Sequence, residues 1–179
     1  MIIVQLTIIF ILLAVIVMVS GHLSQILIKN STPFFSSGKK IIKKAIENIE
    51  IEPEMTIYEL GCGKAEFLKQ IKREHPRKNL KLVGVENFIF PLLLLKIQNK
   101  IKGYNIEIKN KDLFQSDFSD ADIIYCFLNV HAMKELKPKL FFQCRPGTKV
   151  VSYQFSIPGV EPEKIIKYSP RNKIYIYKI

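Results

Sequence analysis

The residues best suited to chemistry surround two glycines, Gly61 and Gly63, which follow a short run of β-forming residues. Glycine adopts backbone angles that other residues avoid, so such a turn lets the backbone lie close to a ligand at the carboxyl end of a strand. Glu59 precedes the turn by two residues, where its carboxylate could accept hydrogen bonds from a cationic amino-acid group. Cys62 lies inside the turn. The combination predicts a binding site for S-adenosylmethionine, which is cationic and carries no phosphate.

Two further carboxylates follow the next two β-rich runs. Glu86 comes 25 residues after Gly61 and could accept hydrogen bonds from both ribose hydroxyls. Asp112 could accept one from the exocyclic amine of adenine, while Leu113 supplies an apolar contact for the ring. Together with the glycine turn, these side chains predict an adenosine pocket.

Two other nucleotide-binding motifs share part of this pattern. A dinucleotide-binding fingerprint needs a third glycine at the position of Glu66, where a carboxylate would repel a pyrophosphate. A P-loop needs a longer spacing between its glycines and a Ser or Thr after Lys64. Neither fits this chain.

The elements that position these residues alternate between β-rich and helical runs, which is typical of a parallel sheet covered by helices. We predict a Rossmann-like α/β fold with a mostly parallel seven-stranded sheet, helices on both faces and a C-terminal antiparallel hairpin. An amphipathic helix over 39–49, capped by Ser36 or Ser37, precedes the first strand. The strands are expected at 56–60, 80–86, 105–109, 122–128, 149–157, 164–168 and 173–178, and the helices between them at 65–74, 88–102 and 132–142, with breaks at Pro91 and Pro138.

The N-terminus predicts a transmembrane helix. Residues 2–19 carry no charge and only Gln5 and Thr7 as polar interruptions, and a helix of this length spans about 27 Å. A cleaved signal peptide would have a basic residue ahead of the apolar run, and a small domain rarely buries a helix that is apolar on every side. The lysines that follow place the remaining chain on the cytoplasmic side, or its organellar equivalent, of a single-pass membrane protein.

The charge balance is strongly basic, with 27 Lys and Arg against 16 Asp and Glu, a net +11. Lipid headgroups explain this excess best, because it begins beside the predicted span; a nucleic-acid partner is disfavoured, since no recognition module accompanies it. The three cysteines form no C-x-x-C pair and have few histidines near them, so we predict reduced thiols and no metal site.

At this point the chain resembles the class I, seven-β-strand methyltransferases, with 59–63 matching their first motif and Glu86 their second. It is more narrowly similar to the small membrane-anchored protein-lysine methyltransferases, whose mitochondrial members modify the ATP synthase c subunit and the adenine nucleotide translocase. Residues 64–66, Lys-Ala-Glu, depart from that family's Asp-Gly-Arg. The segments that carry the narrower resemblance are 33–37, 84–87, 112–114 and 127–128.

The resemblance implies that Phe34 and Phe35 line the entry to the active site and that Asn87 lies beside the cofactor. An aromatic slot would favour a neutral lysine amine by desolvation and hold the methylated cation by cation–π attraction; simple packing of both rings is the alternative. Asn129, after the fourth strand, is a candidate for orienting the acceptor. His131 is interpreted as a residue at the start of a helix.

These inferences predict an enzyme with residues 1–22 as membrane anchor, 23–35 as connector and 36–179 as methyltransferase domain. The expected acceptor is a lysine of a membrane or membrane-associated protein, because an anchored enzyme meets substrates in the same plane. A lipid, quinone or other small acceptor is the first alternative. A non-catalytic binding module at the membrane is the second, and the oligomeric state stays open.

Overall fold

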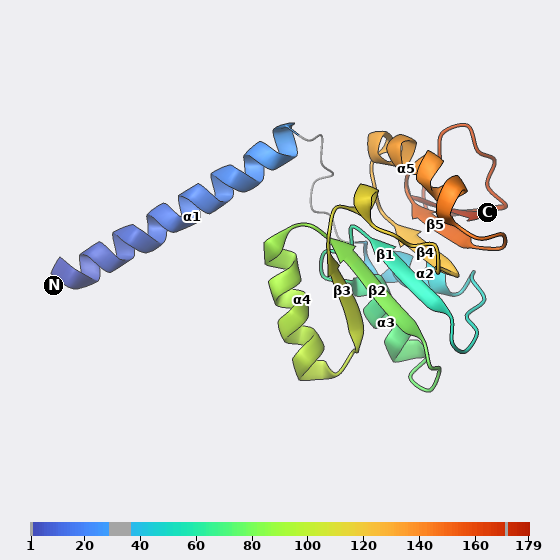
Figure 1. Ribbon diagram of the computed structural model, residues 1–179, viewed down its shortest axis with the longest axis horizontal. Coiled ribbons are helices and arrows are strands. Elements are labelled where there is room, and N and C mark those ends of the chain that lie inside the picture. The colour runs from blue at the N-terminus through green and yellow to red at the C-terminus, as the bar shows by residue number, and fades with distance from the viewer. Residues whose placement is uncertain (1, 29–36, 171) are drawn as a thin grey trace. The chain divides into compact units, whose positions relative to one another are not determined.

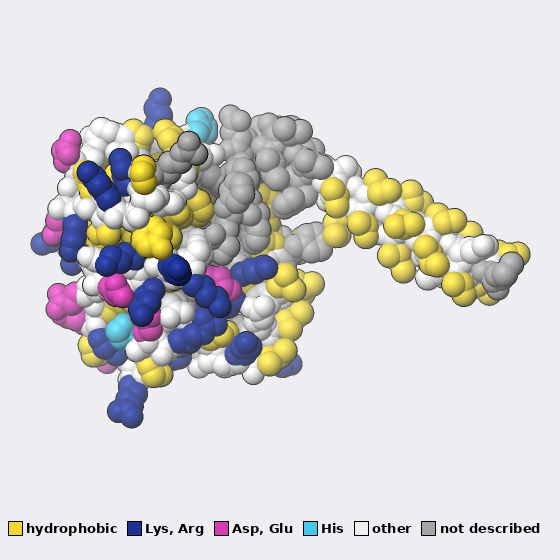
Figure 2. Space-filling model, turned by 180° about the vertical axis from the view of Figure 1, so that it is seen from behind, with side chains coloured by type: hydrophobic (Ala, Val, Ile, Leu, Met, Phe, Trp, Pro, Cys, Tyr) yellow, Lys and Arg dark blue, Asp and Glu magenta, His cyan; other side chains and the backbone are white. Residues whose placement is uncertain are grey.

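The computed structural model describes residues 2–28, 37–170 and 172–179, and it divides the chain into two compact units, 1–33 and 34–179. The first unit contains helix α1, Ile2–Ile28. Its segment Ile2–Ser20 has a mean hydropathy of 3.2 and no burial, so it is long and apolar enough to cross a membrane, as a signal sequence also is. Figure 2 shows hydrophobic side chains along the visible face of this helix. The helix extends beyond residue 22, where the sequence predicted the anchor to end.

The second unit is built on one seven-stranded sheet with the order β3-β2-β1-β4-β5-β7-β6 (Figure 1). The first five strands are parallel, while β7 runs antiparallel between β5 and β6. All five residues of β1 are buried, as expected for the central strand of a parallel sheet. The strands are β1 Thr56–Leu60, β2 Lys81–Glu86, β3 Ile106–Asn110, β4 Ile123–Cys126, β5 Lys149–Tyr153, β6 Lys164–Lys167 and β7 Lys173–Lys178.

Helices cover both faces of the sheet and bury a separate apolar core on each. The core on one face includes Ile42, Leu68 and Leu95, which come from α2, α3 and α4. The core on the other face includes Met133 and Leu140 of α5. The predicted Rossmann-like fold with its C-terminal hairpin is thus confirmed. The helices are α2 Lys39–Ile46, α3 Glu66–Glu74, α4 Ile89–Lys102 and α5 Val130–Gln143, with the short 3-10 helix η1 Leu113–Gln115.

Three elements end earlier than predicted, α2 at Ile46, β4 at Cys126 and β5 at Tyr153, and three further local predictions were wrong. Helix α5 continues through Pro138, because its buried face holds it against the sheet although proline removes one hydrogen bond. Pro91 lies in the first turn of α4, where its missing N–H has no intrahelical partner, so it does not break the helix. Gly38 is the N-cap of α2, and Ser37 Oγ instead accepts a hydrogen bond from the Tyr125 hydroxyl at 2.7 Å; Ser36 lies outside the described residues.

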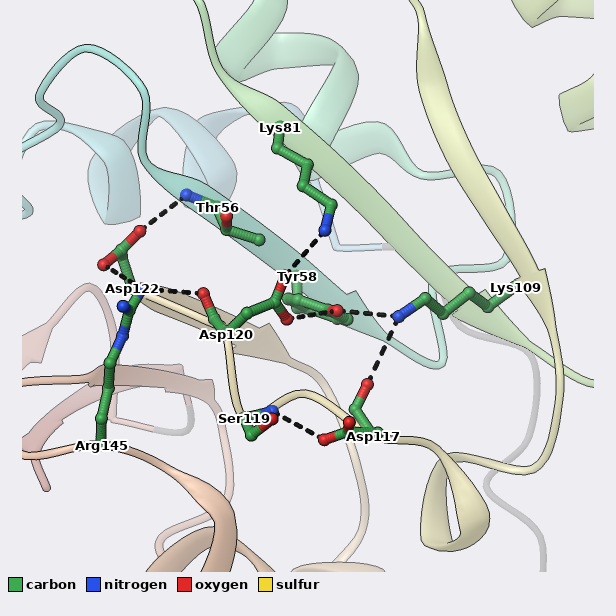
Figure 3. Close-up of polar contacts among 9 residues, drawn as sticks. All are labelled: Thr56, Tyr58, Lys81, Lys109, Asp117, Ser119, Asp120, Asp122 and Arg145. Atoms are coloured by element: carbon green, nitrogen blue, oxygen red, sulfur yellow. Dashed lines mark hydrogen bonds and ion pairs between the residues drawn. The ribbon is translucent and has the colours of Figure 1, made fainter.

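A polar network joins the amino ends of the strands, at the edge of the sheet away from the glycine turn (Figure 3). The Tyr58 hydroxyl donates to Asp120 at 2.8 Å, and Lys81 pairs with the same carboxylate at 2.7 Å. Asp122 accepts from the backbone N–H of Thr56 at 2.7 Å. Burial and the hydrogen bond to Asp120 raise the pKa of Tyr58. The partners come from several strands, so the network positions their starts relative to one another.

Candidate cofactor-binding site

The glycine turn directly continues β1 and leads into α3. Gly61 has a φ of 66° and Gly63 a φ of 51°, a left-handed conformation that glycine adopts without a steric penalty. Ala65 is also left-handed, with a φ of 53°, at a cost of about 1 kcal/mol for a residue with a Cβ. Ala65 therefore adopts a glycine-type conformation at the position where the family that the sequence resembles has glycine.

Glu86 holds the turn from the end of the neighbouring strand. Its Oε2 accepts the N–H of Gly63 at 2.9 Å. Its Oε1 accepts the N–H groups of Asn87 at 2.9 Å and Phe88 at 3.0 Å. A carboxylate offers about four acceptor positions, so these bonds leave one position, on Oε2. That position could accept a ribose hydroxyl, and the contacts predicted between Glu86 and both ribose hydroxyls stay a prediction.

Glu59 is buried beneath the turn and caps helix α3. Its Oε2 accepts the N–H of Leu68 at 3.2 Å, and the Phe67 N–H is a second backbone donor. The N-cap residue Ala65 has no side chain that could do this. Burial raises the pKa of Glu59 to about 8, against the lowering effect of these hydrogen bonds. A cationic ligand group beside it would favour the ionised form.

Cys62 packs against β2 and fixes the position of the turn over the sheet. Its N–H donates to the carbonyl of Val85 at 3.0 Å. A Cβ built on Gly84 would lie 2.8 Å from the Cys62 Sγ, closer than real Cβ contacts allow. Burial and the nearby carboxylates of Glu59 and Glu86 raise the pKa of the Cys62 thiol. Cys62 therefore supplies packing and backbone to the turn rather than a reactive thiolate.

The two remaining residues predicted for the adenine lie at the carboxyl end of β3. Asp112 Oδ1 accepts the N–H of Phe114 at 3.0 Å and so caps η1. Asp112 and Leu113 are both half-buried. Because the carboxyl ends of parallel strands meet at one edge, this pair shares an edge with the glycine turn and Glu86.

A cluster of aromatic residues lies at the carboxyl ends of β4 and β5, and the sequence did not predict that these rings meet. Phe127 follows β4, and its ring centroid lies 4.6 Å from that of Tyr153 and 6.4 Å from that of Phe155. The sequence does contain one signal for this cluster. Aromatic residues occur at every second position at the ends of β4 and β5, which are neighbouring parallel strands. Asn129 caps α5 by accepting the N–H of Ala132 at 2.8 Å. Phe34 and Phe35 lie outside the described residues.

Other chemistry has little support among the described residues. Within 2–28, 37–170 and 172–179, no group of three or more His, Cys, Asp or Glu could hold a metal ion. The cysteines are free and buried, and burial raises the pKa of Cys126 to about 12 and that of Cys144 to about 11. These thiols stay protonated at neutral pH.

Comparison with known proteins identifies the family of this chain. The family model of the ANTKMT methyltransferase domain matches residues 59–164. A protein-lysine N-methyltransferase of Saccharolobus islandicus (strain REY15A) is 30% identical over 153 residues, which cover 82% of this chain and 93% of the relative. A carboxy-S-adenosyl-L-methionine synthase of Campylobacter hominis is 26% identical over 112 residues, 63% of this chain and 45% of the relative.

Solved structures share the fold. An RNA methyltransferase from Salinibacter ruber in complex with S-adenosyl-L-homocysteine has a TM-score of 0.75 at 24% identity, covering 81% of this chain and 94% of that one. A ribosomal protein L11 methylase from Lactobacillus delbrueckii has a TM-score of 0.61 at 13% identity, with 76% of each chain covered. The sheet order and the glycine turn thus define a class I methyltransferase that uses S-adenosylmethionine. Within that class, the chain belongs to the ANTKMT methyltransferase domain family.

Glu59 gives the domain a distinctive pH dependence. Its pKa is raised from 4.5 to about 8 in the folded chain, so between these values the folded state holds a proton that the unfolded state has lost. The free energy of unfolding therefore decreases as pH rises through this window. Between about pH 6 and pH 8 the expected loss is about 2 kcal/mol. Denaturant unfolding of the ligand-free protein measures it.

Glu59→Gln keeps an oxygen for the Leu68 N–H but removes the titration. Its unfolding free energy should vary less with pH than that of the wild type, by the amount assigned to Glu59. Glu107→Gln, at an exposed position of β3, is the matched control and should keep the wild-type slope. A Glu59→Gln slope equal to the wild-type slope would contradict the raised pKa.

Proposed function

We propose that this methyltransferase is anchored in a membrane by α1 and methylates a lysine of a membrane or membrane-associated protein. The observation that carries the proposal is the relative at 30% identity, a protein-lysine N-methyltransferase covered over 93% of its length. The apolar segment Ile2–Ser20 supports the membrane location. The proposed organisation is 1–22 as anchor, 23–35 as connector and 36–179 as catalytic domain on the cytoplasmic side.

The proposed cofactor contacts use the edge formed by β1, β2 and β3. Gly61, Cys62 and Gly63 would offer backbone to the ligand, and Glu86 a ribose acceptor through Oε2. The remaining proposed contacts are Glu59 for the amino group, Asn87 beside the ribose, and Asp112 with Leu113 around the adenine. The hydrogen bonds that Glu86 accepts from the N–H groups of Gly63 and Asn87 support this, because they preset the shape of the turn.

S-adenosylmethionine supplies an electrophilic methyl group when it is bound. The chain's own residues then have to strip water from a lysine amine, favour its neutral form and orient its lone pair. The pair of Phe127 and Tyr153 supports an apolar, cation-tolerant wall on the acceptor side. Phe34 and Phe35 are proposed to complete this wall, and the hydrogen bond from Tyr125 to Ser37, two residues beyond Phe35, supports the placement. Asn129 is proposed to orient the acceptor.

Methyl transfer into total membranes tests the acceptor. The full-length chain, incubated with methyl-labelled S-adenosylmethionine and membranes, should label protein bands in which mass spectrometry finds methylated lysine. Label that extracts into organic solvent would identify a lipid or quinone acceptor instead. Cofactor binding without any transferred label would favour a non-catalytic module.

Variants separate the wall from the cofactor site in the same assay. Phe34→Ala and Phe35→Ala should lower transfer to protein at least about tenfold, by losing desolvation and cation–π contact, with little change in cofactor affinity. Phe142→Ala is the matched control, because this ring is 90% exposed on α5. Equal activities of all three variants would contradict the role proposed for Phe34 and Phe35.

A further inference from the structure

Helix α4 presents an apolar face to solvent although it belongs to a folded domain. Leu92 and Leu95 are buried on its inner side. Its outer side exposes Ile97 at 48% and Ile101 at 75%, and Ile89, Leu93 and Leu94 lie in the same range. Figure 2 shows hydrophobic side chains along the edge of the domain that α4 occupies, with Lys and Arg side chains beside them. We call the five exposed residues the α4 ridge: Ile89, Leu93, Leu94, Ile97 and Ile101.

The spacing aligns the ridge along one side of the helix. Ile89, Leu93, Ile97 and Ile101 recur every four residues, so their side chains lie in one row about 18 Å long. Lys96 and Lys100 are exposed and follow Leu93 and Ile97 by three residues, which places them in the adjacent row. The helix contains no acidic residue. An apolar row therefore stands beside a row of positive charge.

The inner contacts of α4 prevent the helix from rotating to bury the ridge. Asn99 bonds both backbone groups of Ile106, donating to its carbonyl at 2.9 Å and accepting its N–H at 3.0 Å. Gln98 accepts a hydrogen bond from the buried Lys69. Gln98 and Asn99 are thus turned inward, and their bonds to α3 and β3 hold the ridge on the outer side of the helix.

We propose that the α4 ridge seats the domain on the surface of a bilayer that contains anionic lipid. A helix with this pattern lies in the interface plane with its apolar row at the acyl boundary, while lysine stems extend along the apolar surface and their ammonium groups reach the phosphates. The exposed ammonium groups of Lys96 and Lys100 favour anionic lipid over an apolar protein groove, because lipid phosphates can pair with them. The chain's own segment Ile2–Ser20 is long and apolar enough to cross a bilayer, so a bilayer is the surface that the ridge would meet first.

This contact would orient the site. Helix α4 begins three residues after Glu86, whose Oε1 accepts the N–H groups of Asn87 and Phe88 at its start. The edge of the sheet that holds the glycine turn would then lie at headgroup level. This consequence rests on both parts of the proposed function, the membrane anchor and lysine methylation, whereas the lipid contact itself rests on the anchor alone.

The chain contains no tryptophan, so one substitution reports on the ridge alone. Ile97→Trp in the full-length chain, reconstituted in nanodiscs of phosphatidylcholine and phosphatidylserine, should lose about half of its emission when the acyl chains carry bromine. Phe142→Trp is the matched control at an exposed ring outside the ridge and should keep its emission. Circular dichroism checks that both variants fold, and Ile101→Trp replaces Ile97→Trp if that variant does not.

The role of the two lysines, and the identity of what covers the ridge, are tested in the Ile97→Trp variant. Lys96→Gln together with Lys100→Gln should remove the quenching, as should discs of phosphatidylcholine alone. Unquenched emission, equal quenching at position 142, or quenching in uncharged discs would overturn the proposal. A blue-shifted but unquenched emission would mean that α1, and not lipid, covers the ridge. Quenching that requires two chains per disc would mean that a second copy of the chain covers it. The readout is lipid contact, so it stands apart from any failure to methylate lysine.

Discussion

Glu86→Ala is expected to weaken S-adenosylmethionine binding at least about a hundredfold, a loss of ~2.7 kcal/mol. The carboxylate is the acceptor for three backbone N–H groups, of Gly63, Asn87 and Phe88, and the proposed acceptor for one ribose hydroxyl. Hydrogen bonds to a charged group contribute about 1.5–3 kcal/mol each. Removal of the side chain takes away the ligand contact and also releases the turn that presents Gly63. Titration calorimetry with the cofactor measures the loss.

Two controls separate this effect from general damage. Glu107→Ala removes a carboxylate from an exposed position of the neighbouring strand β3 and should bind the cofactor as the wild type does. Glu86→Gln keeps the shape but offers an NH2 where the backbone presents N–H groups, so its affinity should fall almost as far. A folded Glu86→Ala protein with wild-type affinity would rule out the proposed role of this residue.

Gly84→Ala is expected to lower the free energy of unfolding by about 2 kcal/mol. The added methyl group would lie 2.8 Å from the Cys62 Sγ and 3.4 Å from its Cβ. Both residues are buried, and Cys62 is held by the bond from its N–H to the Val85 carbonyl. Neither backbone can retreat without moving the glycine turn, so cofactor affinity should fall together with stability. Denaturant unfolding measures the first effect and calorimetry the second.

A double mutant identifies the clash as the cause. Cys62→Ala removes the sulfur, so the combination of Cys62→Ala with Gly84→Ala should recover most of the loss, giving a coupling energy of about 1 kcal/mol or more. Gly38→Ala is the control, because a Cβ there meets nothing within 4 Å and its φ is −62°. Simple additivity of the two buried substitutions would show that the clash is not what makes Gly84 necessary.

The order of strands and helices could be predicted because each element carries its own periodicity. The run 56–60 consists of β-forming residues except for Glu59, and Gly103 ends α4 in the left-handed conformation with a φ of 59°. The boundary errors occurred where local rules compete with packing. At Pro138 the buried face of α5 outweighed the proline, and at Ser37 the hydrogen bond from Tyr125 replaced a helix cap.

The candidate site was predicted to a similar extent. Glycines and carboxylates at the ends of β-rich runs indicated the cofactor, and the residues proposed to contact it stay a prediction. What those carboxylates bond in the folded chain was not predictable: Glu59 caps α3, and Glu86 holds the turn. The contacts among the rings of Phe127, Tyr153 and Phe155 were not predictable either, because these residues come from β4 and β5 and their loops and meet only after the two strands pair.

The sequence by itself determined the fold class, the cofactor and the apolar N-terminal segment, since each depends on residues that are close together in the chain. Only the tertiary structure decided that Gly84 has to be glycine, that Glu59 is buried with a pKa of about 8, and that α4 turns an apolar ridge outward. The physical reason is the same in each case. Burial and exposure are properties of the neighbours that folding brings to a side chain, and those neighbours are distant in the sequence.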